Sequence, residues 1–142
     1  MKNNKELAQF YNKVYIKGEK KHFTIKRESV SLSEIKEVLK QVSWKGKKVL
    51  DVGCGTGLFA FNAAKKGAIV LGVDFSTEAI QIAQSQYTHK NLEFESTDVN
   101  KIKEKFDVIV SNGTLEHMDN PLKTLRLFKK HFKDFSGTVL EI

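Results

Sequence analysis

The sequence predicts an α/β protein with a doubly wound parallel sheet of about five strands and helices on both faces. Short apolar runs alternate with segments whose apolar residues recur at helical spacing, which is typical of successive strand–helix units. The first apolar run ends in an acid and three alternating glycines, within residues 51–57, and a helical pattern starts directly afterwards. Because parallel strands joined by helices are buried on both faces, we expect the sheet to form the centre of one domain.

Five runs rich in aliphatic and β-branched residues predict the strands of this sheet. The expected strands are residues 48–52, 68–73, 92–95, 106–111 and 138–142. The last of these runs reaches the end of the sequence.

Capping signals place the helices between these strands. Ser31 with Glu34 three residues later forms a capping-box pattern, Ser76 precedes a helix, and Asp119 or Asn120 precedes a helix with Pro121 in its first turn. The expected helices are an amphipathic one over residues 7–15, one after Ser31, one over residues 58–66, one after Ser76 and one after Asn120.

The composition is that of a globular chain. Charged residues make up 29% and hydrophobic residues 40% of the 142 positions, which excludes a disordered protein. No apolar run approaches the roughly 18 residues that span a bilayer, and the N-terminus lacks an apolar signal core. We therefore expect a cytoplasmic protein without a transmembrane segment. The single cysteine, Cys54, excludes an internal disulfide and is expected to be a small buried filler.

Positive charge is concentrated at the N-terminus. The net charge is +7, yet residues 1–48 carry +8 and the remaining residues carry −1. We divide the chain into an N-terminal helical lid with a basic loop, residues 1–46, and a core, residues 47–142. The basic excess fits either a solvated surface or an anionic partner such as RNA or a membrane surface.

Acidic residues follow successive predicted strands at the edge where open parallel sheets bind ligands. Asp51 suits a ligand with an ammonium group, Asp74 can accept hydrogen bonds from the two hydroxyls of a ribose, and Asp98 can accept one from an exocyclic amine. Phe75, next to Asp74, can pack on a purine. The alternatives are that Asp74 leads into a helix cap, that Asp98 pairs with Lys101 and that Phe75 belongs to the core.

Two motifs resemble those of class I S-adenosylmethionine-dependent methyltransferases, which have a Rossmann-like fold. The first is Leu-Asp-Val-Gly-Cys-Gly-Thr-Gly at residues 50–57. The second is Phe-Asp-Val-Ile-Val at residues 106–110, followed by Leu-Glu-His-Met-Asp-Asn-Pro at residues 115–121. The second motif is most similar to the small-molecule branch that includes quinone-biosynthesis methyltransferases. The resemblance extends over residues 49–142.

This resemblance implies a role for each residue of the site. The glycine loop would hold the methionine part of S-adenosylmethionine, Asp74 its ribose, and Phe75 with Asp98 its adenine. The implied cofactor-binding residues are Asp51, Gly53, Gly55, Gly57, Asp74, Phe75, Asp98, Val99 through its backbone N–H, and Asn112. His117 would be the catalytic base, although a histidine with only a structural role in its loop is an equal alternative. No metal is expected.

The function implied by the resemblance is methyl transfer to a small-molecule acceptor. The family usually has seven strands that end in a hairpin, so this chain is expected to lack the hairpin, to be a fragment of a longer protein, and to offer its fifth-strand edge to a homodimer. A cofactor-binding module without activity and an RNA methyltransferase are alternatives. A dinucleotide-binding oxidoreductase fits less well, because the glycines at positions 53, 55 and 57 follow Gly-x-Gly-x-Gly and Asp51 would repel a pyrophosphate.

Overall fold

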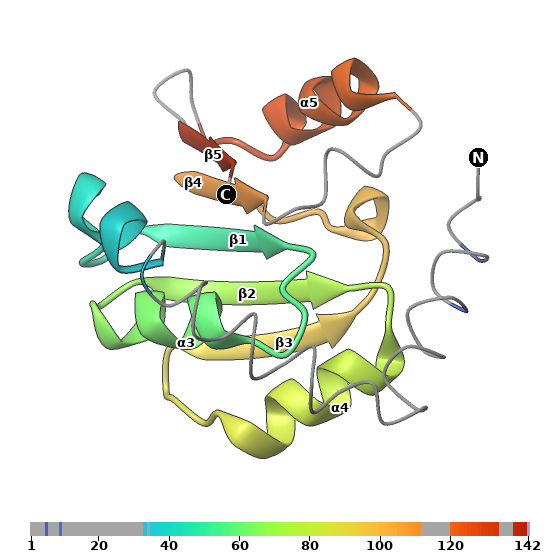
Figure 1. The fold of residues 1–142 in the computed structure, drawn as a ribbon. Coiled ribbons are helices and arrows are strands. Elements are labelled where there is room, and N and C mark those ends of the chain that lie inside the picture. The colour runs from blue at the N-terminus through green and yellow to red at the C-terminus, as the bar shows by residue number, and fades with distance from the viewer. Residues whose placement is uncertain are drawn as a thin grey trace.

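A five-stranded parallel sheet forms the centre of the protein (Figure 1). The computed structural model describes residues 35–111, 120–133 and 138–141, together with residues 5, 9 and 33. The strands are β1 (Lys48–Val52), β2 (Ile69–Asp74), β3 (Leu92–Ser96), β4 (Val108–Ser111) and β5 (Thr138–Glu141). Their order is β3-β2-β1-β4-β5, and every neighbouring pair is parallel.

This order reverses direction beside β1. The chain builds outward from β1 to β2 and β3, and then returns to the other side of β1 to add β4 and β5. The point between β1 and β4 is therefore a topological switch point, where the loops leave the strand ends in opposite directions. Any ligand of this sheet is expected at the carboxyl ends of these strands.

Helices cover both faces of the sheet (Figure 1). Helices α3 (Leu58–Lys65) and α4 (Thr77–Gln86) lie on one face, and α5 (Pro121–Lys130) lies on the other. A 3-10 turn, η1 (Val99–Lys101), connects β3 to β4, and residues 35–41 are also helical. None of the helices in the described part of the chain has both the length and the apolar character needed to cross a bilayer.

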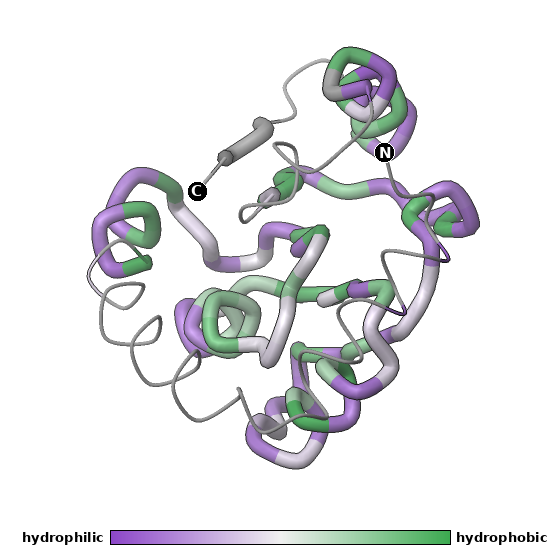
Figure 2. The backbone as a smooth tube through the Cα atoms, turned by 45° about the vertical axis from the view of Figure 1, so that its right-hand side comes forward, coloured by the Kyte–Doolittle hydropathy of each residue, from purple (hydrophilic) through white to green (hydrophobic). Residues whose placement is uncertain are grey.

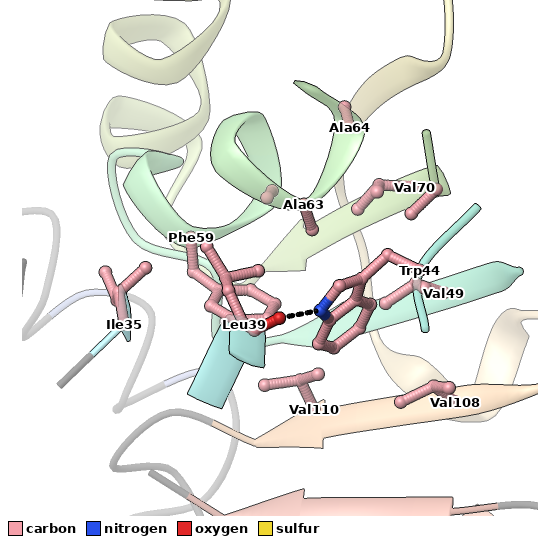
Figure 3. Close-up of a cluster of buried hydrophobic side chains, with 12 residues drawn as sticks. Ile35, Leu39, Trp44, Val49, Phe59, Ala63, Ala64, Val70, Val108 and Val110 are labelled. Atoms are coloured by element: carbon pink, nitrogen blue, oxygen red, sulfur yellow. Dashed lines mark hydrogen bonds between the residues drawn. The ribbon is translucent and has the colours of Figure 1, made fainter. Parts of the chain in front are cut away.

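Alternate residues of the strands pack into two apolar clusters, one on each face. On the α3 face, Val49 of β1 belongs to one buried cluster with Phe59 of α3 and with Leu39 and Trp44 (Figure 3). The Trp44 ring meets Phe59 edge-on with centroids 5.8 Å apart, and its Nε1 donates to the carbonyl of Leu39 at 2.9 Å. The segment before β1 therefore contributes to the core as well as leading into it.

On the opposite face, the second cluster joins β1 and β4 to α5. Leu50 and Ile109 are fully buried there, together with Phe106 and with Phe128 of α5. Figure 2 shows that apolar residues, coloured green, are frequent along the strands, whereas the helices show both green and purple. Adjacent positions such as Val49 and Leu50 thus face opposite layers, as expected for a sheet buried on both sides.

The fold class and the strand–helix order expected from the sequence are confirmed. Two of the expected helix caps are confirmed as well, because Ser76 accepts from the backbone N–H of Ala79 and Asn120 accepts from that of Lys123. The capping box of Ser31 and Glu34 lies outside the described residues and stays a prediction. One strand is shorter than expected: β4 begins at Val108, and Phe106 instead forms an isolated bridge to Phe132. The expected helix over residues 7–15 lies outside the described residues apart from residue 9, and the expected lack of a C-terminal hairpin stays a prediction.

Candidate functional site

The glycine loop after β1 is fixed over the end of β2. Gly53, Gly55 and Gly57 all have positive φ, at 73°, 55° and 90°, which other residues rarely adopt. The backbone N–H groups of Gly53 and Cys54 both donate to the carbonyl of Val73, at 2.8 and 3.0 Å. The predicted loop is therefore a tight turn at the switch point.

Gly57 is required by packing. A Cβ on this residue would lie 2.5 Å from Cζ of Phe94 in β3 and 3.2 Å from Cβ of Ala83 in α4. Its N–H donates to the carbonyl of Cys54 at 3.0 Å. The lack of a side chain thus lets the start of α3 approach β3 closely, and a ligand-binding role for Gly57 stays a prediction.

Cys54 lies inside this turn. It is buried, and its Sγ lies 3.1 Å from where a Cβ on Gly72 would be. Burial raises the pKa of its thiol well above the ordinary range, and the carboxylates of Asp51 and Asp74 raise it further. A thiol held in its neutral form is a poor nucleophile, in agreement with a filling role.

Asp74 connects the glycine loop to the start of α4. One of its carboxylate oxygens accepts from the N–H of Gly55 at 2.9 Å, and the other accepts from the N–H of Ser76 at 2.9 Å. Burial raises the pKa of Asp74, whereas these hydrogen bonds oppose the shift. Each oxygen keeps a further lone pair, so the carboxylate can still accept bonds from a ligand. The expected ribose-binding role is compatible with this geometry and stays a prediction.

Asp51 is the most unusual residue of the site. It is fully buried at the end of β1, and neither carboxylate oxygen has a hydrogen-bond partner in the structure as far as it is described. Burial raises its pKa to about 7, and the negative charge of Asp74 adds to the shift. Because an unpaired buried carboxylate is costly, Asp51 is a candidate for binding a ligand that carries a positive charge or donates hydrogen bonds, and the expected ammonium-binding role stays a prediction.

The loop after β3 lies beside the end of β2, since the N–H of Thr97 donates to the carbonyl of Asp74 at 3.2 Å. Asp98 caps η1 by accepting from the N–H of Asn100 at 2.9 Å and from its side-chain amide at 2.7 Å. The next residue, Val99, is buried in the second cluster. The residue before Asp98 is therefore bonded to the end of β2, and the expected adenine-binding role of Asp98 stays a prediction.

Other expected residues are less completely described. Phe75 is half-buried and is not named in either apolar cluster, and its expected packing on adenine stays a prediction. Asn112 and His117 lie outside the described residues, so their roles stay predictions. Within residues 35–111, 120–133 and 138–141, no group of three His, Cys, Asp or Glu side chains could hold a metal ion.

Sequence reasoning overlooked one polar group at the same edge. Ser111, the last residue of β4, is fully buried and its hydroxyl has no hydrogen-bond partner among the described residues. It pairs in register with Val52, directly after Asp51. The available signal was a small polar residue at the end of an apolar strand.

Comparisons with known proteins give consistent results. A family profile described as "Methyltransferase domain" matches residues 43–141. The ubiquinone biosynthesis O-methyltransferase of Coxiella burnetii (strain Dugway 5J108-111) is 36% identical over 114 residues, which are 74% of this chain and 49% of that protein. The corresponding protein of Haemophilus ducreyi is 38% identical over 98 residues, which are 62% of this chain and 42% of that one.

The fold is also shared with solved methyltransferases. The magnesium protoporphyrin IX methyltransferase of Synechocystis PCC 6803, crystallised with bound SAM, superposes with a TM-score of 0.77 at 16% identity, over 94% of this chain and 73% of that one. A coclaurine N-methyltransferase bound to N-methylheliamine and SAH superposes with a TM-score of 0.70 at 23% identity, over 78% and 34% of the two chains.

Replacing Asp51 by asparagine is expected to make the protein more stable at neutral pH. The raised pKa means that the native state holds the Asp51 proton more tightly than the unfolded chain, so this residue costs progressively more stability from pH 4 to pH 7. The gain in unfolding free energy from Asp51→Asn should reach up to about 4 kcal/mol at pH 8 and fade towards pH 4. Denaturant unfolding over this pH range measures it.

The control is Asp107→Asn, which should show the opposite trend. Asp107 accepts from the N–H of Lys48 and from Lys133, and these bonds lower its pKa. Its variant should therefore lose stability at pH 8, and the loss should fade in acid. If the free energy of unfolding changed with pH in the same way for the wild type and for Asp51→Asn, the raised pKa of Asp51 would be refuted.

Gly57→Ala should destabilise the protein more than Gly46→Ala. Both glycines have positive φ, but a Cβ on Gly46 meets nothing within 4 Å whereas one on Gly57 meets Phe94. The backbone conformation alone costs about 1–2 kcal/mol, and overpacking at Gly57 should add about 1–3 kcal/mol. Thermal and denaturant unfolding compare the two, with Phe94→Leu expected to relieve part of the Gly57→Ala loss. Equal losses would show that packing at Gly57 is not limiting.

Proposed function

The chain belongs to the methyltransferase-domain family, and from this premise we propose that it binds S-adenosylmethionine at the carboxyl ends of β1, β2 and β3 and transfers its methyl group to a small-molecule acceptor. The chain spans about half the length of the curated relatives it matches, 49% for the protein from Coxiella burnetii. Methyl transfer by the whole protein is therefore part of what we propose.

The single observation that carries the proposal is the unpaired carboxylate of Asp51. S-adenosylmethionine carries an ammonium group and a sulfonium, so a buried anion beside the glycine loop complements it. Asp74 adds a second acid near the same position, since its charge acts on Asp51. A diphosphate would meet both carboxylates and be repelled, which disfavours a dinucleotide cofactor.

The remaining residues are proposed to contact different parts of the cofactor. Asp74 is proposed to accept from the ribose hydroxyls with the lone pairs that Gly55 and Ser76 leave free. Phe75 would pack against the adenine, and Asp98 with the backbone N–H of Val99 would read its edge. Gly53 and Asn112 would contact the methionine end.

Catalysis in this proposal rests mainly on alignment. The cofactor supplies an activated methyl group, so the protein must hold the acceptor in line with it, which can contribute about 7–11 kcal/mol. His117 would remove a proton where the acceptor is a hydroxyl. The names of the curated relatives support an O-methyl acceptor of the ubiquinone-precursor class.

The N-terminal segment is proposed to close over this edge as a lid. Its later part is already fixed in the core by Ile35, Leu39 and Trp44. The earlier basic part of the segment lies outside the described residues, so its share in the lid stays a prediction. RNA as acceptor and a homodimer through the β5 edge stay predictions from the sequence, and no specific observation favours either.

Two ligands separate the proposed roles of Asp51 and Asp74. S-adenosylhomocysteine contains the amino-acid part, whereas 5′-methylthioadenosine has the same nucleoside without it. Asp51→Asn should weaken S-adenosylhomocysteine binding by about 1–3 kcal/mol and leave methylthioadenosine unchanged. Asp74→Ala should weaken both, because both contain the ribose. Isothermal titration calorimetry measures these affinities, and Asp107→Asn is the control that should change neither.

Binding of NAD together with no binding of S-adenosylhomocysteine or methylthioadenosine would contradict the proposal. Loss of both ligands in Asp51→Asn would show that this residue acts on the nucleoside or on the fold. If S-adenosylhomocysteine binds as expected but no labelled methyl group reaches a phenolic acceptor, the chain is a cofactor-binding module without activity.

A further inference from the structure

The outward side of α5 combines exposed leucines with positive charges. We call the side of the helix formed by Leu122, Leu125, Arg126 and Lys129 the α5 surface. Leu122 is 68% exposed and Leu125 is 38% exposed, and they are two of the three large hydrophobic residues that stand out as exposed in the described part of the chain. Sequence periodicity predicted the helix but not that these leucines would face solvent.

Helical spacing places these four residues on one stripe. They follow each other at i, i+3, i+4 and i+7, so they share the side of α5 that faces away from the sheet. The opposite side carries Phe128, which is fully buried in the second cluster. The leucines are therefore not needed to hold α5 on the described core.

The charge of this helix has one sign. Between Pro121 and Lys130 there are four basic residues and no acid, and all four basic residues are exposed. Neither Arg126 nor Lys129 has an ion-pair partner among the described residues. Residues 49–142 carry a net charge of −1 with α5 included, and without the four basic residues of α5 they carry −5, so α5 is a local concentration of positive charge.

Exposed leucines and positive charges on the same side of α5 favour one class of partner over the others. A second copy of the chain would bring cations against cations in a symmetric contact. A nucleic acid would use the cations but would leave the leucines without a role. An anionic bilayer uses both, because leucines enter the acyl boundary while Lys and Arg extend to the lipid phosphates.

We propose that the α5 surface docks the protein on the anionic surface of a lipid bilayer. The leucines occupy the first half of α5, which follows the loop from the carboxyl end of β4 (Figure 1). Docking through them therefore holds the edge of the sheet that contains Asp51 and Asp74 near the bilayer. The proposal stands independently of the chemistry at that edge.

The test is co-sedimentation of the full chain with vesicles of equal parts phosphatidylglycerol and phosphatidylcholine, compared with pure phosphatidylcholine vesicles. Binding should be selective for the anionic vesicles and weaken as salt is raised. Leu122→Ser with Leu125→Ser should reduce the partition coefficient by at least about tenfold. Arg126→Gln with Lys129→Gln should reduce it by about tenfold or more.

Matched controls separate the patch from general effects. Ile69→Ser removes an exposed aliphatic side chain at the start of β2, and Lys36→Gln with Lys66→Gln removes two exposed charges outside α5. Neither control should change binding, and all variants should keep the wild-type melting temperature within a few degrees.

The outcomes are distinct. Selective loss in the α5 variants alone supports the proposal. Equal losses in the controls, or no binding to anionic vesicles, overturns it. Salt-sensitive RNA binding that needs Arg126 and Lys129 but not the leucines replaces the bilayer by a nucleic acid. A dimer that Leu122→Ser converts to a monomer in gel filtration replaces it by a second copy.

Discussion

The buried carboxylate of Asp51 is the constraint on which the candidate site depends. Its two oxygens have no hydrogen-bond partner among the described residues, and it lies in the centre of the sheet at the end of β1. Burial raises its pKa to about 7, so the protein without ligand keeps a group that is poorly stabilised as an anion. Natural proteins keep such groups mainly where a ligand or a reaction uses them.

The fold accounts for the position of this group and for its surroundings. The reversal of strand order beside β1 leaves the carboxyl end of that strand free of a crossing helix. Asp74 then connects the loop after β1 to the start of α4 through Gly55 and Ser76. Close packing of Gly57 against Phe94 seats α3 beside the same edge. A carboxylate, a tight turn and a helix start therefore meet at one place.

Sequence patterns predicted the local features well, because those features are set by nearby residues. Ser76 and Asn120 cap helices through bonds to residues three positions away, and the glycine loop follows from its spacing. The sequence also predicted that Asp51, Asp74 and Asp98 come at the same edge of the sheet, because the carboxyl ends of parallel strands lie on the same side.

Features that depend on residues distant in sequence could not be predicted. The missing partners of Asp51 and Ser111 become evident only when every neighbour is placed. Gly57 contacts Phe94, which lies in β3, and Phe106 pairs with Phe132 after α5. Helical periodicity likewise places Leu122 and Leu125 on one side of α5 without showing that this side faces away from the sheet.

The most direct measurement of the central claim is the number of protons released when S-adenosylhomocysteine binds. Calorimetry at pH 7 in buffers of different ionisation enthalpy gives this number. With the pKa of Asp51 at about 7, roughly half of the molecules hold its proton before binding, so about half a proton should be released per ligand. The release should vanish in Asp51→Asn and persist in Asp107→Asn. Binding without proton release by the wild-type protein would show that Asp51 does not receive the cation, and the account of this site would be wrong.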